Sequence, residues 1–359
     1  MESLLFRSIA VLSSLAAPVI AEVPDVVTDI APVHGLVSQV MDGVGAPALL
    51  LRQGQSPHTY SMRPSDARSL ENADLVFWIG EGLTPWLVKP LNALATGATS
   101  IELLEIEDLP LLSYAEDDDH DDHDDHDDAK DDDHDDHGDV KDGDHDDHDD
   151  HDDAKEEDHD AHDDDAEHAS EEEADHDKSG DHHHHGDVDP HAWLDPQIAQ
   201  VWLGSIADAL STADPENAAA YQKNAKVAQM GLSKLDADLM ADLVTIQKEP
   251  FVAFHDAYGY LEARYGLTNA GTVSPGDATR PGAAQILRLK KEIAERDIRC
   301  GFAEPQYDPA LLKVAGEGSQ LEISVLDPLG TDLELGVGFY PNLMRALAGS
   351  LIDCLAQQR

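Results

Sequence analysis

The stretch DPENAAAYQKNAKVAQMGLSKLDADLMADLVTIQK at residues 214–248 decides the architecture that we expect for this chain. Its apolar residues recur at steps of three and four from Tyr221 to Leu243, which is the spacing of one helix face. Asp214 as N-cap and Pro215 at the first helical position would begin the helix. At ~1.5 Å per residue the helix would span roughly 50 Å, which is long for one lobe and suits a strut between two.

The segments on both sides of this stretch alternate between strand and helix patterns. Apolar runs typical of buried parallel strands are followed by helical patterns, a rhythm that indicates α/β architecture. The expected strands before the long helix are VPDVVTDI (23–30), ALLLRQG (48–54) and DLVFWIG (74–80). Those after it are PFVAFHD (250–256), TNAGTV (268–273), IRCGFAEP (298–305) and LEISVLDPLG (321–330). We therefore predict two α/β lobes, an N-terminal lobe at 22–213 and a C-terminal lobe at 249–359, joined by the helix at 214–248.

The first 21 residues have the pattern of a cleavable secretory signal. Arg7 supplies the positive charge, a short apolar core follows, and Val19-Ile20-Ala21 offers small residues for cleavage. The apolar run is shorter than the ~20 residues that cross a bilayer, and the rest of the chain holds no better candidate. We expect an exported mature protein with no membrane span.

The charge of the chain is concentrated in one insert at residues 116–187. The formal net charge is −52 over 359 residues, and this window alone holds 39 Asp and Glu against four Lys, a net of −35. It also holds 16 of the 20 histidines, and HDDHDDHDDAK at 120–130 recurs at 145–155. Such a composition buries too little apolar surface to fold, so we expect a disordered loop. Nucleic acid is not an expected partner, because the 23 Lys and Arg form no basic run.

The two cysteines, Cys300 and Cys354, are an even pair in a chain that we expect to be exported. This favours one disulfide, between a strand and the C-terminal helical segment. A cysteine metal site is a weak alternative, because the close spacing of zinc-binding cysteine pairs is absent.

Only four histidines lie outside the insert: His34, His58, His191 and His255. Each follows a strand or lies where a loop meets a helix, and ligands of open α/β sheets bind at the carboxyl ends of strands. Asp327 also ends an apolar strand, where a metal role and a turn role are equally consistent with the pattern.

The chain resembles the solute-binding receptors for zinc and manganese of bacterial ABC importers. The resemblance is carried by PHTYSMRPSDARSLENADLVFWIG (57–80), DPHAWLDP (189–196), FVAFHDAYGYLEARYGL (251–267), CGFAEPQY (300–307) and LDPLGTD (326–332), with an acid-histidine loop between the first two. The pieces appear in the family's order and together cover nearly all of residues 23–356. The resemblance implies two α/β lobes joined by a single long helix, with metal bound in the cleft between the lobes.

Carried over by this resemblance, the metal ligands are His58, His191 and His255, with Asp327 or a water molecule in the fourth position. His34 matches no ligand, and we expect it at the surface or beside the cleft. Manganese-type relatives usually have a carboxylate where His255 stands, and three imidazoles suit Zn²⁺ better than Mn²⁺. Some zinc-type relatives have Glu before the first histidine. Here that residue is Pro57, which favours Asp327 or water.

The resemblance implies a monomeric periplasmic receptor that captures Zn²⁺ and hands it to an inner-membrane ABC transporter permease. The alternatives are a zinc storage or buffering protein, a receptor for another divalent metal such as manganese or nickel, and a zinc hydrolase. We expect no enzyme, because no general base stands at a known motif spacing such as HExxH.

The insert would bind further zinc weakly, since histidine tracts bind metal readily. The candidate auxiliary ligands are His120, His123, His126, His134, His137, His145, His148, His151, His182, His183, His184 and His185.

Overall fold

The computed structural model describes residues 23–113, 188–274 and 281–358, all within the same compact unit. The signal sequence expected at 1–21 and the acid-histidine insert at 116–187, with its auxiliary histidines, lie outside the described residues.

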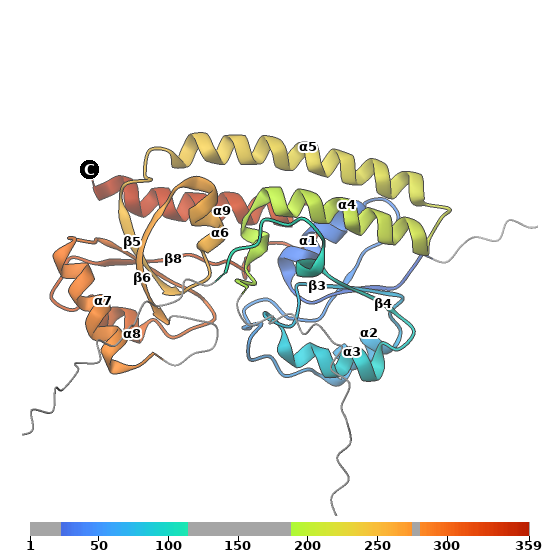
Figure 1. Cartoon of the computed structure of the whole chain (residues 1–359), viewed down its shortest axis with the longest axis horizontal. Helices are drawn as coiled ribbons and strands as arrows, with labels where there is room; N and C mark the ends of the chain where they lie inside the picture. Colours follow the sequence, from blue (N-terminus) through green and yellow to red (C-terminus); the bar gives the residue numbers. More distant parts are fainter. Residues whose placement is uncertain (1–22, 114–187, 275–280, 359) are drawn as a thin grey trace, which may run out of the picture. The chain divides into compact units, whose positions relative to one another are not determined.

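Two four-stranded parallel sheets form the framework (Figure 1). The first has the order β2-β1-β3-β4, and the second has the equivalent order β6-β5-β7-β8. Their strands are β1 (Val26–Thr28), β2 (Ala48–Leu49), β3 (Leu75–Trp78), β4 (Thr99–Glu102), β5 (Pro250–His255), β6 (Thr268–Ser274), β7 (Cys300–Ala303) and β8 (Glu322–Val325). The strand patterns of the sequence predicted all of these except β4. That strand has exposed and half-buried side chains, so it lacks the apolar run that marked the others.

Helices connect the strands, as parallel pairing requires. They are α1 (Ala31–Val40), α2 (Pro64–Glu71), α3 (Val88–Leu94), α4 (Pro196–Ala213), α5 (Ala218–Leu243), α6 (Gly259–Tyr265), α7 (Ala283–Glu295), α8 (Ala310–Ala315) and α9 (Phe339–Leu355). Short 3₁₀ turns lie at η1 (Pro85–Leu87), η2 (Leu103–Glu105), η3 (Ala192–Leu194) and η4 (Ala356–Gln358). No helix of the described residues is long and apolar enough to cross a membrane.

The long helix exists, but it is shorter than the sequence predicted. α5 has 26 residues, which at ~1.5 Å each gives roughly 39 Å, and it begins at Ala218 rather than Asp214. The Asp214 carboxylate accepts hydrogen bonds from the backbone and side-chain nitrogens of Asn217 and from the hydroxyl of Tyr221. These bonds close a turn ahead of the helix, so Asp214 follows α4 as its C-cap and does not cap α5.

α5 contacts elements of both halves of the chain. It packs against α4 and α1 on the N-terminal side and against α6 and α9 on the C-terminal side (Figure 1). Asp236 of α5 forms an ion pair with Arg264 of α6 and accepts a hydrogen bond from the hydroxyl of Tyr265. α9 also contacts both α1 and β8. The long helix α5 thus contacts both halves of the chain, as the sequence predicted, and α9 adds further contacts between them.

The main apolar core is continuous between the two sheets. It includes Phe77 of β3, Trp202 of α4, Leu232 of α5, Phe251 of β5 and Leu343 of α9. Smaller clusters cover the opposite faces of the first and second sheets. The predicted disulfide is present, with Cys300 of β7 bonded to Cys354 of α9.

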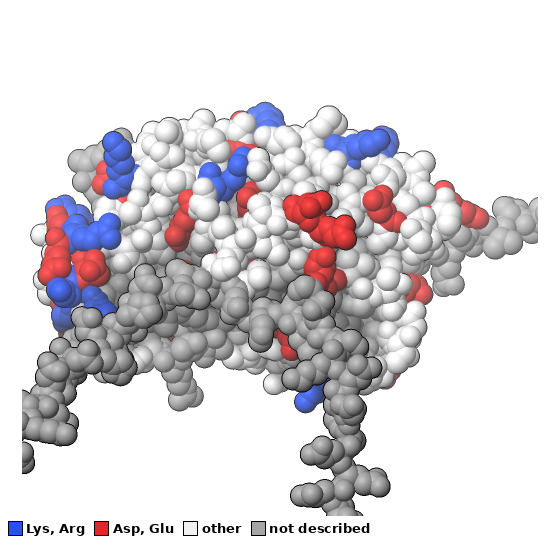
Figure 2. All heavy atoms as spheres, in the orientation of Figure 1, with Lys and Arg blue, Asp and Glu red and all other residues white. Residues whose placement is uncertain are grey.

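At the left of Figure 2, over α7, Lys and Arg side chains lie beside acidic ones. On and around α7, Lys291 pairs with Glu295, Lys290 with Glu317, and Arg299 with Asp297. These surface pairs contribute little to stability, but they offset the positive charge locally.

Candidate metal centre

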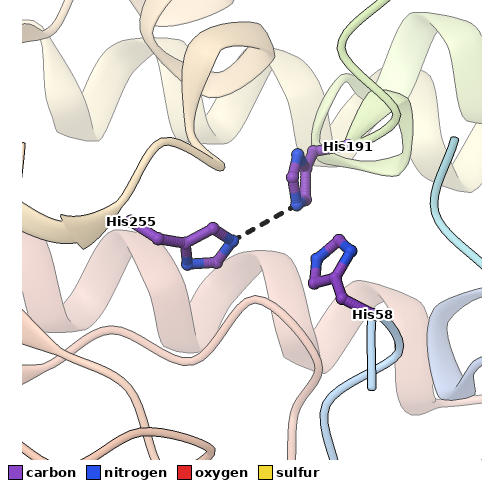
Figure 3. A group of neighbouring side chains, drawn as sticks. All are labelled: His58, His191 and His255. Carbon is purple, nitrogen blue, oxygen red and sulfur yellow. Dashed lines mark hydrogen bonds between the residues drawn. The ribbon is translucent and has the colours of Figure 1, made fainter. Parts of the chain in front are cut away.

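Three histidines from distant parts of the chain meet at one point (Figure 3). His58 lies in the loop after β2, His191 directly before η3, and His255 is the last residue of β5. One nitrogen from each ring lies within 4.8 Å of the others. The structure therefore brings together the three histidines that the sequence singled out: His58, His191 and His255.

His191 is held by a carboxylate two residues before it. Its Nδ1 lies 2.7 Å from Oδ1 of Asp189, and its backbone N–H donates to the same oxygen at 3.0 Å. Both side chains are buried. The restricted backbone of Pro190 keeps the two residues in this local turn. Asp189 therefore sets the direction in which the His191 ring points.

His255 is held by Glu304, which is 49 residues away in sequence. Glu304 directly follows β7, the neighbour of β5, and its Oε1 lies 2.6 Å from Nδ1 of His255. Glu304 is only 3% exposed. No pattern in the sequence had predicted a partner for the His255 ring, so this contact was missed. The position of Glu304 at a strand's carboxyl end, beside the strand of His255, was the signal that could have revealed it.

The carboxylates of Asp189 and Glu304 determine which nitrogen of each histidine ring carries the proton. A neutral imidazole that donates its Nδ1–H to a carboxylate carries a lone pair on Nε2. The Nε2 atoms of His191 and His255 face each other at 3.4 Å. A tetrahedral zinc site with Zn–N bonds of ~2.05 Å has an edge of about 3.3 Å between ligand nitrogens. The spacing is that of two ligands of one tetrahedral ion.

His58 completes the triangle from a loop. Its ring centroid lies 5.8 Å from that of His191 and 6.1 Å from that of His255. The loop is fixed by the indole of Trp86, which donates to the carbonyl oxygen of Pro57 at 2.6 Å. His58 is half-buried, whereas the other two histidines are buried.

The cavity at this point is small. Its volume is about 10 Å³, on the scale of one water molecule, and an organic ligand would need hundreds of cubic ångströms. It is lined by the three histidines together with Pro57, Trp193, Glu304, Gln306, Tyr307, Pro328 and Leu329. The arrangement suits a single ion.

Comparison with known proteins gives the family of the chain. The family described as ZnuA, zinc-uptake complex component A, periplasmic, matches residues 26–354. The chain belongs to the ZnuA family. The high-affinity zinc uptake system protein ZnuA of Paracoccus denitrificans (strain Pd 1222) is 45% identical over 347 residues, 96% of each chain. That of Brucella suis biovar 1 (strain 1330) is 39% identical over 332 residues, 92% of each.

Solved structures share the ZnuA fold. A crystal structure of ZnuA matches 93% of this chain and 99% of its own, with a TM-score of 0.66 and 17% identity. A zinc-bound ZnuA with residues 138–173 deleted, in its own numbering, also gives a TM-score of 0.66. Family membership confirms the resemblance seen in the sequence. The chain is a periplasmic zinc-binding receptor of a zinc-uptake system.

Asp327, which shared the fourth ligand position with a water molecule in the sequence prediction, is not among the residues of the histidine cluster. Its Oδ1 accepts the backbone N–H of Leu329 at 3.0 Å and Nε2 of Gln306 at 3.2 Å. Its Oδ2 accepts the backbone N–H of Thr331 at 2.6 Å. The carboxylate therefore closes the turn after β8, and it lines a different cavity, with Pro305.

His34 was expected at the surface or beside the cleft, and the surface alternative is wrong. It lies on α1 with 8% of its surface exposed, because α1 packs into the main core. Its Nδ1 lies 3.4 Å from the hydroxyl of Ser38. Burial lowers the pKa of His34 from its ordinary value, since the charged form would lose its solvation. His34 is not part of the ZnuA-type cluster.

Proposed function

We propose that this chain captures Zn²⁺ with His58, His191 and His255 and delivers the ion to an inner-membrane ABC transporter permease. The observation that carries the proposal is the 3.4 Å separation of the two Nε2 atoms, each opposite a carboxylate-bound Nδ1. When both rings are neutral, the two Nε2 lone pairs repel unless a proton or a metal ion lies between them, so the arrangement favours binding a cation.

The donor set favours zinc over manganese. Three imidazoles suit Zn²⁺, whereas Mn²⁺ prefers oxygen ligands. The fold alone does not separate the metals, because the Mn²⁺ complex of FpvC from Pseudomonas aeruginosa gives a TM-score of 0.66 as well. Nickel and copper also bind imidazole, so selectivity against them depends on tetrahedral geometry and on supply.

Binding of the ion would hold the two halves of the chain together. His58 and His191 belong to the N-terminal part of the chain, and His255 belongs to the second sheet. Zinc joins these parts through one set of bonds, and its loss releases them. The packing of α5 and α9 on both halves would limit the movement to a small rocking. The loaded form would be the one that the permease recognises.

We propose capture without catalysis. A hydrolase would need a general base, and Glu304 is the buried carboxylate that lines the cavity. Its Oε1 already binds Nδ1 of His255. A carboxylate in that position orients a ligand instead of activating water. The zinc-loaded protein should leave ester and peptide substrates unchanged, and turnover above the rate of free zinc would contradict this view.

We further propose that the chain is exported by residues 1–21, works as a monomer, and carries weak additional zinc sites in the insert at 116–187. These sites would serve the main one by concentrating zinc near it. A receptor of this kind differs from a storage protein in having one tight site that does not depend on the insert.

Competitive zinc titration of the mature chain, beside a variant lacking residues 116–187, tests the proposal. We expect one tight equivalent in both proteins and extra weak equivalents only in the full chain. If the deletion removed the tight site, or if the full chain held only weak sites, storage by the insert would be the better description. A parallel titration with Mn²⁺ should give much weaker binding.

A further inference from the structure

Gln306 has a side-chain oxygen that the fold does not use. Its Oε1 is buried and, among the described residues, has no hydrogen-bond donor. Buried polar atoms in folded proteins almost always have a partner, so an exception calls for a ligand or a water molecule. Gln306 lines the small cavity of the three histidines.

The orientation of the amide follows from its other neighbours. Nε2 of Gln306 lies 3.2 Å from Oδ1 of Asp327 and 3.1 Å from the hydroxyl of Thr331. Exchanging the two ends of the amide would bring Oε1 against the Asp327 carboxylate, where two acceptors would repel. The NH₂ group therefore belongs to the turn after β8, and Oε1 is left without a donor.

The carboxylate of Asp327 already accepts hydrogen bonds from the turn after β8. Its two oxygens serve the N–H groups of Leu329 and Thr331 as well as the Gln306 amide. If the carboxylate moved to the metal, two backbone donors and one side-chain donor would lose their acceptor at once. The structure thus places an engaged carboxylate outside the histidine cavity and an unengaged amide oxygen among its lining residues.

We propose that Gln306 is a positioning residue for zinc: a water molecule is the fourth ligand and donates a hydrogen bond to Gln306 Oε1. The inference rests on the proposed function, since it takes zinc to be bound by the three histidines. Zinc in such a site takes a fourth ligand, and water bound to zinc is a strong hydrogen-bond donor. An amide oxygen accepts that bond without adding charge.

The test uses the mature chain with three substitutions. Gln306→Met keeps the length of the side chain and removes the acceptor. Thr331→Val removes one partner of Nε2 and leaves Oε1 in place, so it is the matched control for the turn. Asp327→Ala removes the carboxylate. Thermal unfolding without metal shows whether each variant is folded.

Three measurements follow. Zinc affinity, from chelator competition, should weaken about 10-fold in Gln306→Met and stay within about 2-fold of wild type in Thr331→Val. The electron paramagnetic resonance lines of the Co²⁺-loaded wild type should broaden in ¹⁷O-enriched water. They should broaden in Asp327→Ala too. A crystal structure of the zinc-loaded chain should show the water within hydrogen-bond distance of Gln306 Oε1.

A zinc–Asp327 bond in that crystal structure, or unbroadened lines in wild type, would overturn the inference. A zinc affinity in Gln306→Met equal to that of wild type would also overturn the inference. In these cases tight binding by wild type leaves the proposed function intact. Failure of wild type to bind zinc tightly would overturn both.

Discussion

Nε2 of His255 lies 3.4 Å from Nε2 of His191, although 64 residues separate the two in sequence. Each ring is turned by its own buried carboxylate, Glu304 for His255 and Asp189 for His191. The protein alone holds the two rings in the arrangement that we propose binds zinc, and this reduces the reorganisation that binding would require.

Replacing each of the three histidines with alanine should weaken zinc binding by about 100-fold or more. Each removes one of three protein ligands, and the remaining two cannot hold a tetrahedral ion tightly. Chelator competition would measure the affinity. His34→Ala is the matched control, because it removes a buried histidine outside the cluster and should change stability without changing zinc affinity. Equal affinity in wild type and the three variants would refute the assignment.

Removing the carboxylates behind the ligands should weaken zinc binding by about 10- to 100-fold, as such partners usually do. Glu304→Ala frees Nδ1 of His255, so the proton can move to Nε2 and block the lone pair. Glu304→Gln retains an acceptor oxygen and should recover part of the loss. The ¹⁵N shifts of the His255 ring in the metal-free protein would report the tautomer directly.

In Asp189→Asn, the ¹⁵N shifts of the His191 ring should change, whereas those of the His255 ring should stay as in wild type. Glu295→Gln, on the exposed surface of α7, is the control for loss of one negative charge. If Glu304→Ala left both the tautomer and the affinity of wild type, Glu304 would have no positioning role.

Stability should depend on pH through Glu262. Burial raises the pKa of this carboxyl from 4.5 to about 7, although the Asn269 side chain donates to it and opposes the shift. Between these two values the folded state holds the proton and the unfolded state has lost it. The unfolding free energy should therefore fall as pH rises from about 4.5 to 7, and then become level.

Glu262→Gln should remove this part of the pH dependence, on the order of 2 kcal/mol after allowance for partial exposure. Urea unfolding of both proteins in EDTA, at several pH values from 4.5 to 7.5, would measure the difference. Parallel curves for the two proteins would show that Glu262 titrates normally.

Reduction of Cys300–Cys354 should lower the unfolding free energy by about 2–4 kcal/mol, because the bond closes a loop with a sequence separation of 54. Urea unfolding of the oxidised and reduced metal-free protein would measure this loss. Zinc affinity should persist in Cys300→Ala/Cys354→Ala, since Cys300 begins β7 and Glu304 follows its other end. A large loss of affinity in that folded variant would contradict this separation.

The sequence alone was sufficient for the features that depend on local pattern. Apolar runs predicted seven of the eight described strands, and helical spacing predicted α5. Family resemblance selected His58, His191 and His255, because their neighbouring residues form motifs that are read along the chain. The disulfide was likewise predicted from the even number of cysteines in a chain that we expected to be exported.

Tertiary structure decided what depends on contacts between distant residues. Glu304 reaches His255 only because β5 and β7 are neighbours in the sheet, and no spacing along the chain encodes that. The packing of α1 buries His34. Asp327 and Gln306 differ in role because the turn after β8 uses both oxygens of one and only the NH₂ group of the other. Sequence motifs named the histidines, whereas the hydrogen bonds of the folded chain determined where their lone pairs point.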